Sequence, residues 1–121
     1  MTTAPVHAGL SDRWMAFSLL EQLGNVGSEV GRTIRAHATG NTARFDQALA
    51  RALELFDLTI SDPRWFGERR REICRAREEF CRLFFDESVH PGSAAGLERY
   101  FLHFAVAANS QRAQSQERAN A

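Results

Sequence analysis

The side chains with the clearest capacity for chemistry are the arginines of residues 64–82. This stretch reads RWFGERRREICRAREEFCR and contains seven Arg and four Glu. The planar guanidinium group binds phosphate or carboxylate through two hydrogen bonds at once, and Trp65 and Phe66 are expected to be exposed beside it. We therefore predict a binding surface for an anionic partner that consists of Arg69, Arg70, Arg71 and Arg75. Because Glu68 and Glu72 interleave with these charges on a helix, a solvated, salt-bridged face is the alternative interpretation.

Patterns typical of metal and cofactor sites are missing from the sequence. The single Glu-x-x-His pair, Glu87 to His90, lies in an expected loop, whereas di-iron bundles need two such pairs on helices. Cys74 and Cys81 would lie about 10 Å apart on one helix, which suits neither a disulfide nor a zinc site. Glycines within a helix do not form a phosphate-binding loop. We therefore predict no metal and no cofactor.

Other polar residues border or interrupt apolar helical faces. A polar stripe follows one expected helix at spacings of three and four residues: Gln22, Asn25, Glu29 and Arg32. Asp57 lies within LELFDLTI, and His103 lies within YFLHFAV. Because buried charges are usually paired, these positions predict a polar network inside the fold. Its predicted members are Asn25, Glu29, Asp57, Arg77 and His103. Ordinary positions at the boundary of the apolar faces are the alternative.

Four helices are expected to carry these side chains, because apolar residues recur with helical spacing and no strand-like alternation is present. The first is expected over about residues 12–38, from Asp12 as its cap. The second opens after Asn41 and stops at the sequence SDP, and the third follows Gly67. The fourth opens after Ser93. Short connections between four amphipathic helices predict an all-α, antiparallel four-helix bundle.

The bundle is expected to occupy residues 12–110 as a single domain. Residues 1–11 and 111–121 are rich in small and polar residues and lack apolar periodicity. We therefore predict loose tails at both ends.

Three glycines lie within the first expected helix, where each costs about 1 kcal/mol of helix propensity relative to alanine. They belong to a seam with alternating spacings of three and four residues: Phe17, Leu20, Gly24, Gly27, Gly31, Ile34 and Ala38. This spacing predicts that Gly24, Gly27 and Gly31 pack closely against another helix. Aromatic candidates to fill the seam are Phe56, Phe80, Phe84 and Phe104. An oligomer interface or a ligand groove along this helix is the alternative.

Charge and composition limit the classes of partner. The formal net charge is zero, and all fifteen basic residues are arginine, as a GC-rich genome would encode. A global positive field that attracts nucleic acid is therefore not expected, and any basic surface must be local. No apolar run approaches the roughly 20 residues that span a bilayer, so we expect a cytoplasmic protein that does not bind membranes.

One short motif resembles that of an enzyme family. The segment RTIRAH, from Arg32 to His37, resembles the Arg-polar-x-x-x-His motif of the HEPN helical ribonucleases. In that family the Arg and the His act on RNA at a dimer interface. The resemblance implies a ribonuclease that uses Arg32 and His37, and this is the alternative to a protein without enzymatic activity.

At the level of the whole domain, EQLGNVGSEV, RALELFDLTI, REEF and YFLHFA resemble a group of small bacterial helical proteins of uncharacterised function. The size and helix count are also similar to those of the four-helix ribosomal-RNA intervening-sequence proteins and the accessory variability proteins of retroelements. Those proteins are oligomeric scaffolds that bind a nucleic acid or a nucleic-acid enzyme. We therefore expect a non-enzymatic, homo-oligomeric adaptor that binds a protein partner, alone or together with RNA.

Overall fold

The computed structural model describes residues 8–90 and 92–120, and it contains helices and no strands within these ranges. The five helices are α1 (Ala8–Ala16), α2 (Leu19–Ala38), α3 (Thr42–Ile60), α4 (Glu68–Phe85) and α5 (Ser93–Asn120). The predicted all-helical class is therefore confirmed, whereas the predicted number of helices was wrong. Within the described residues no helix is both long and apolar enough to cross a membrane.

The additional helix arises because the chain breaks at Ser18, inside the single helix predicted over residues 12–38. Ser18 has an extended backbone, and its hydroxyl accepts a hydrogen bond from the Glu21 amide at 3.1 Å. The Glu21 carboxylate in turn accepts the Ser18 amide at 3.1 Å. This reciprocal capping box begins α2 at Leu19, because it satisfies two amides that would otherwise lack partners at a helix start.

The other helix boundaries follow from local signals. Gly40 has a φ of 71°, a left-handed conformation that glycine adopts without strain, and it ends the turn after α2. The Asn41 side chain then accepts the Arg44 amide at 3.1 Å and caps the start of α3. Helix α3 ends at Ile60, immediately before the Ser-Asp-Pro sequence that was expected to stop it.

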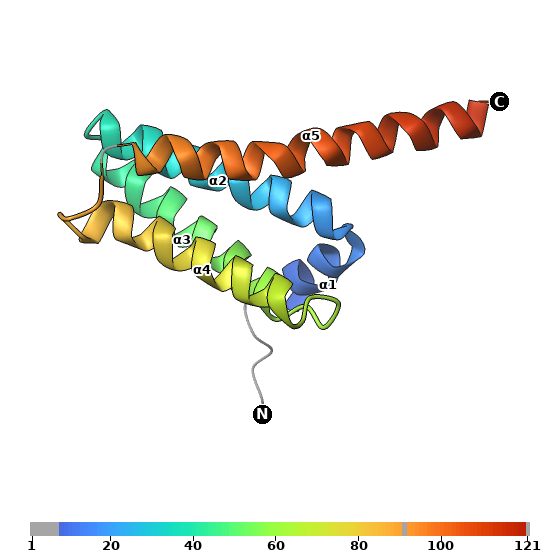
Figure 1. Cartoon of the computed structure of the whole chain (residues 1–121), viewed down its shortest axis with the longest axis horizontal. Coiled ribbons are helices and arrows are strands. Elements are labelled where there is room, and N and C mark those ends of the chain that lie inside the picture. The colour runs from blue at the N-terminus through green and yellow to red at the C-terminus, as the bar shows by residue number, and fades with distance from the viewer. Residues whose placement is uncertain (1–7, 91, 121) are drawn as a thin grey trace.

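Helix α2 packs against both α3 and α5, and α4 completes the arrangement through contacts with α3 and α5 (Figure 1). Successive helices from α2 to α5 run in opposite directions along a shared axis (Figure 1). The largest fully buried apolar side chains come from all four of these helices: Leu23, Val26, Val30, Phe56, Ile73, Phe80 and Phe101. Burial of apolar surface along this axis holds the helices together.

The glycine seam of α2 is covered by α5 of the same chain. A Cβ atom on Gly27 would lie 2.4 Å from the Phe101 Cβ, and one on Gly24 would lie 3.2 Å from the Ala105 Cα. Gly31 is buried, and a Cβ there would meet the Arg35 guanidinium at 3.2 Å. The aromatic residue at the seam is therefore Phe101, which was not among the four candidates named from the sequence.

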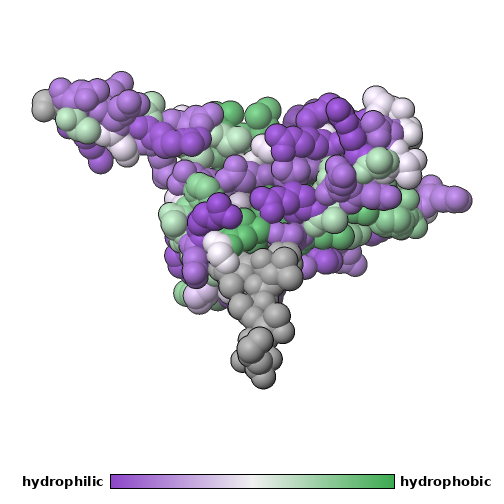
Figure 2. Space-filling model, turned by 180° about the vertical axis from the view of Figure 1, so that it is seen from behind, coloured by the Kyte–Doolittle hydropathy of each residue, from purple (hydrophilic) through white to green (hydrophobic). Residues whose placement is uncertain are grey.

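The C-terminal part of α5 projects beyond the other helices (Figure 1). Residues 109–120 are all helical and all exposed, whereas the composition predicted a loose tail from residue 111. At the other end, residues 8–11 belong to α1 instead of the predicted tail. Residues 1–7 lie outside the described part of the chain. In Figure 2 the projecting arm is almost entirely hydrophilic, while hydrophobic atoms reach the surface at the upper edge of the body beside it.

Candidate functional site

A buried polar network joins α1, α2, α3 and the loop after α3. The Gln22 side-chain amide donates to the Trp14 carbonyl at 2.9 Å and to the Asp62 carboxylate at 2.9 Å. Its oxygen accepts the indole N–H of Trp65 at 3.2 Å. The indole N–H of Trp14 donates to the Thr59 hydroxyl at 3.0 Å. All five side chains are buried, so each hydrogen bond replaces water that the fold has excluded.

Arg64 completes this network at its outer edge. Its guanidinium lies 2.7 Å from the Asp62 carboxylate, whose side chain is 1% exposed, and it also donates to the Phe17 carbonyl at 2.8 Å. Hydrogen bonds from Arg64 are the main reason why the pKa of Asp62 falls to about 2, and the Gln22 amide adds to the effect. These contacts fasten α1 and the loop to α2. We therefore assign the network to stability, because its groups are occupied with one another.

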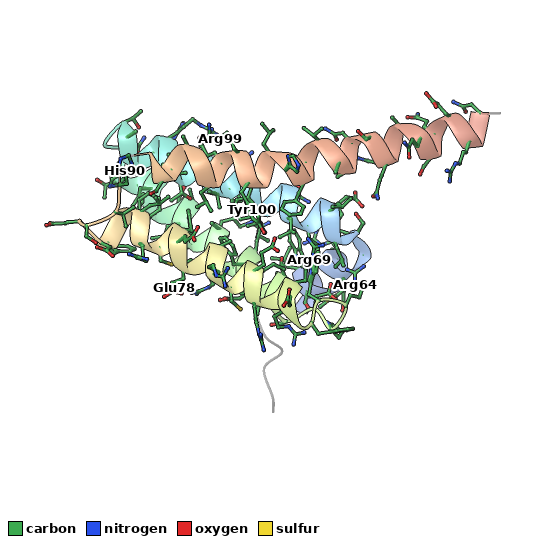
Figure 3. The ribbon with its side chains drawn as sticks, viewed as in Figure 1. Arg64, Arg69, Glu78, His90, Arg99 and Tyr100 are labelled. Atoms are coloured by element: carbon green, nitrogen blue, oxygen red, sulfur yellow. The ribbon has the colours of Figure 1, made fainter. Side chains whose placement is uncertain are left out.

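Two of the four arginines predicted to bind an anionic partner contact groups of their own chain. The Arg69 guanidinium stacks over the Trp65 ring at 5.4 Å, and both Arg64 and Arg69 lie at the loop end of the bundle (Figure 3). Arg70 turns inward and donates to the Asp62 carbonyl at 3.2 Å. Trp65 is buried, against the prediction, because its indole belongs to the Gln22 network. Of the four predicted residues, only Arg71 and Arg75 are exposed and free of these contacts.

The predicted polar network of five residues is not assembled. Asp57 accepts a hydrogen bond from Arg77 at 3.0 Å, but the Asp57 side chain is 63% exposed. Asn25 and His103 are exposed, and Glu29 pairs locally with Arg32. These residues lie beside the apolar faces of their helices and not on them. Each step of one residue along a helix rotates the side-chain direction by about 100°, so a neighbour of an apolar residue points away from the apolar face.

Arg32 and His37 face different surroundings. Five residues on one helix separate two side chains by about 140° around its axis. The Arg32 guanidinium pairs with the Glu29 carboxylate at 2.5 Å. The His37 ring instead contacts the rings of Phe45 and Phe84, at centroid distances of 5.4 and 5.0 Å. Within one chain the two side chains therefore contact different groups.

A basic groove lies between the C-terminal half of α2 and the N-terminal half of α3. It encloses about 650 Å³ and is lined by Glu29, Arg32, Arg35, Ala36, Thr39, Asn41, Arg44, Gln47, Ala48 and Arg51. Four of these residues are arginine and one is acidic, and the only apolar side chains are alanines. We call these ten residues the α2–α3 groove. Its composition suits a polar anion and not an apolar ligand.

The arginines of the groove differ in how far their charge is already neutralised. Arg32 pairs with Glu29 at 2.5 Å, and Arg51 pairs with Glu54 at 3.1 Å. Arg35 and Arg44 make no ion pair with any carboxylate in the described ranges. Both are exposed. Arg35 and Arg44 are therefore the two arginines of the groove without an ion pair, and the Arg35 guanidinium lies over Gly31, where the Glu98 carboxylate of α5 is also close. The sequence-based prediction missed these two residues, because they belong to different helices and no run of arginines marks them.

A second groove, of about 610 Å³, separates α4 from the start of α5. Here Arg75 and Arg82 are balanced by Glu72 and Glu79. Tyr100 points toward α4 and donates a hydrogen bond to Glu72 (Figure 3). Burial, followed by the adjacent Glu72 carboxylate, raises the pKa of Tyr100 well above its usual value. Balanced charges and an un-ionised phenol give this groove no preference for an anion.

No group of three or more His, Cys, Asp or Glu side chains within the described ranges is arranged to hold a metal ion. Comparisons of the chain with protein-family models, with curated proteins and with solved structures found no match. The α2–α3 groove is therefore selected as the candidate site on its geometry and charge alone.

Proposed function

We propose that this chain is a non-enzymatic helical adaptor that binds the phosphate groups of an RNA-containing partner through the α2–α3 groove. The antiparallel four-helix core of α2, α3, α4 and α5 would serve as a rigid scaffold for this surface. The proposal keeps the class of function that the whole-domain resemblance implies, an accessory scaffold for a nucleic acid or its enzyme. It moves the contact surface from α4 to the groove.

The charge of the groove is the observation that carries the proposal. Over the whole sequence, fifteen arginines balance fifteen acidic residues, whereas the groove has four arginines and one glutamate. Local excess positive charge attracts a polyanion even when the net charge is zero. Arg35 and Arg44 come from different helices, so a phosphate between them could accept hydrogen bonds from both sides. Asn41 and Gln47 add neutral donors along the same path.

The test is a comparison of two charge-reversal variants in an RNA-binding assay. Arg35→Glu/Arg44→Glu changes the groove, and Arg71→Glu/Arg75→Glu makes the same change in net charge on α4. Fluorescence anisotropy of a labelled single-stranded RNA would be measured for each over a series of salt concentrations. We expect the groove variant to bind more weakly, with a salt dependence reduced by roughly one for each lost phosphate contact. The α4 variant should stay close to wild type.

Two results would contradict this proposal. If only the α4 variant lost affinity, the originally predicted arginine surface would be the contact. If the wild type showed no salt-dependent binding of RNA, the groove would have another role. Far-UV circular dichroism should be unchanged in both variants, because all four arginines are at the surface or at its edge.

The ribonuclease alternative gains no support from the surroundings of its two residues, and we expect no RNA cleavage by the wild type. Incubation with RNA in the absence of metal, followed by gel analysis, checks this directly. Turnover that disappeared in His37→Ala while RNA binding persisted would establish the alternative, because a general acid or base acts mainly on the transition state.

A further inference from the structure

The outer face of α5 carries an apolar stripe with no partner in its own chain. Leu102 is 60% exposed and Val106 is 56% exposed. They are four residues apart, and Asn109 and Ala113 continue the same stripe at spacings of three and four, which is the spacing of a helix-pairing seam. Figure 3 shows that Arg99, on this face, points away from the bundle, whereas Tyr100 points toward α4.

The same helix extends beyond the bundle. Residues 109–120 are helical and exposed, none of their side chains is an apolar group larger than alanine, and the ion pair between Arg112 and Glu21 ties the start of the arm to α2. A polar helix of this length is marginal in water unless it packs on something. The helix nevertheless continues for about three turns past the bundle. We therefore expect the arm to pack on a surface outside its own chain.

We propose that α5 pairs in the antiparallel direction with α5 of a second copy of this chain, around a two-fold axis near residue 104. The spacing of its residues carries this assignment. Leu102 and Val106 are centred on position 104, and so are Arg99 and Asn109. One axis therefore places Leu102 of each copy beside Val106 of the other, so that both apolar stripes are covered at once.

Charge complementarity fits the same axis. Glu98 and Arg112 are centred on position 105, so the axis brings Glu98 of one copy toward Arg112 of the other along one edge of the pair, the edge where the Glu98 carboxylate lies over Gly31 of its own α2. Within its own chain Arg112 is 63% exposed, forms an ion pair with Glu21 at 4.0 Å and donates a hydrogen bond to Asn109. A parallel pair would instead bring identical charges together, which is unfavourable.

The same axis places the projecting arm of one copy against α5 of the other. With position 104 at the centre, residues 109–115 of one copy lie beside residues 93–99 of the other, the first two turns of its α5, and residues 116–120 extend past that helix start. Each arm therefore covers the part of the partner helix that its own bundle leaves exposed. This pairing uses no residue of the α2–α3 groove, so it does not depend on the proposed function.

The first test measures the oligomeric state of the full chain by sedimentation velocity over a range of concentrations. We expect a dimer for the wild type and for Phe66→Glu, a control that changes an equally exposed apolar residue, 69% exposed, on the loop before α4. Leu102→Glu/Val106→Glu should raise the dimer dissociation constant by at least about tenfold. The fold should persist, because both side chains are exposed.

The second test determines the direction of the pair by disulfide formation. Leu102→Cys and Val106→Cys are each made in a chain whose Cys74 and Cys81 are replaced by serine. An antiparallel pair predicts faster cross-linking in an equimolar mixture than in either variant alone, and a parallel pair predicts the reverse. A wild type that stays monomeric, a dimer unaffected by the Glu substitutions, or faster cross-linking in the separate variants would overturn the proposal.

Discussion

At the scale of single residues, Gly27 is the position where α2 and α5 come closest. We expect Gly27→Ala to lower the free energy of unfolding by about 1–3 kcal/mol, the usual cost of overpacking a core. The added Cβ would lie 2.4 Å from the Phe101 Cβ, and neither atom can move without its backbone. This cost outweighs the gain of about 1 kcal/mol in helix propensity. Urea unfolding measures the difference.

Gly96 provides a matched control for the same substitution. It lies near the start of α5, and a Cβ there would meet no heavy atom within 4 Å. Gly96→Ala should therefore raise the free energy of unfolding, by up to about 1 kcal/mol. Equal effects of the two substitutions would show that the contact between Gly27 and Phe101 is not tight.

Asp62 gives the fold a predictable dependence on pH. Its pKa is about 2 in the folded protein, compared with 3.8 for an unconstrained aspartate. The ionised carboxylate therefore favours the folded state by roughly 2 kcal/mol above about pH 5. This contribution decreases as the pH falls below about 5, and it is lost as the pH falls through the folded-state pKa of about 2.

Asp62→Asn tests this assignment, because an asparagine cannot titrate. At neutral pH we expect it to unfold more easily than the wild type by roughly 2 kcal/mol. The difference in unfolding free energy between the wild type and Asp62→Asn should shrink toward zero as the pH falls through about 2. The other carboxylates titrate in both proteins, so they do not contribute to this difference. Urea unfolding at a series of pH values gives the difference directly. A constant difference from pH 7 to pH 2 would place the effect in packing instead of charge.

At the scale of elements, the capping box at Ser18 decides that α1 and α2 are separate helices. Ser18→Ala removes the hydroxyl that accepts the Glu21 amide and should cost about 1 kcal/mol of unfolding free energy. Ser18→Asp keeps an acceptor and should remain close to the wild type. Thermal and urea unfolding of the three proteins compare them. If Ser18→Ala and Ser18→Asp behaved alike, the cap would not stabilise the helix start.

The elements that could be predicted from the sequence are those with local signals at both ends. Helix α3 was expected between Asn41 and the Ser-Asp-Pro stop, and it spans Thr42–Ile60. The break at Ser18 was missed, because Phe17 and Leu20 continue the apolar spacing across it. The sequence does contain the Ser-x-x-Glu signature of a capping box at this point, and that signature indicates the start of a second helix.

Polar contacts between helices, in the buried network as in the α2–α3 groove, were harder to predict, because their residues meet only after the helices pack. Gln22 was recognised as part of a polar stripe, but its partner Asp62 is forty residues away along the chain. Asp57 was expected inside the bundle, and its side chain is 63% exposed because it lies one position past the buried Phe56. Hydrophobic spacing locates a helical face, whereas polar partners across helices depend on the path of the loops.

At the scale of the whole molecule, the two proposed surfaces are separate. The α2–α3 groove lies where α2 leads into α3, and the apolar stripe lies on the outer face of α5. Paired copies would therefore leave both grooves open. Two grooves on one dimer would bind one RNA more tightly than a single groove, because the second contact is intramolecular. We therefore expect Arg35→Glu/Arg44→Glu to weaken the contact of each groove with RNA. Leu102→Glu/Val106→Glu should weaken RNA binding by separating the two grooves of the dimer.

The final prediction concerns the projecting arm and follows from its lack of apolar contacts. At protein concentrations below the dimer dissociation constant, the amides of residues 113–120 should exchange with deuterium almost as fast as an unfolded chain. An isolated polar helix of this length opens readily, since no apolar contact opposes its opening. Above that constant the amides of residues 113–115, which lie beside the start of the partner helix, should become protected. Mass spectrometry of peptides after timed exchange measures both conditions, with residues 97–108 as an internal control that stays protected throughout. Protection of the arm that did not change with concentration would mean that the arm is stable on its own, and the pairing of two α5 helices would not be needed to explain it.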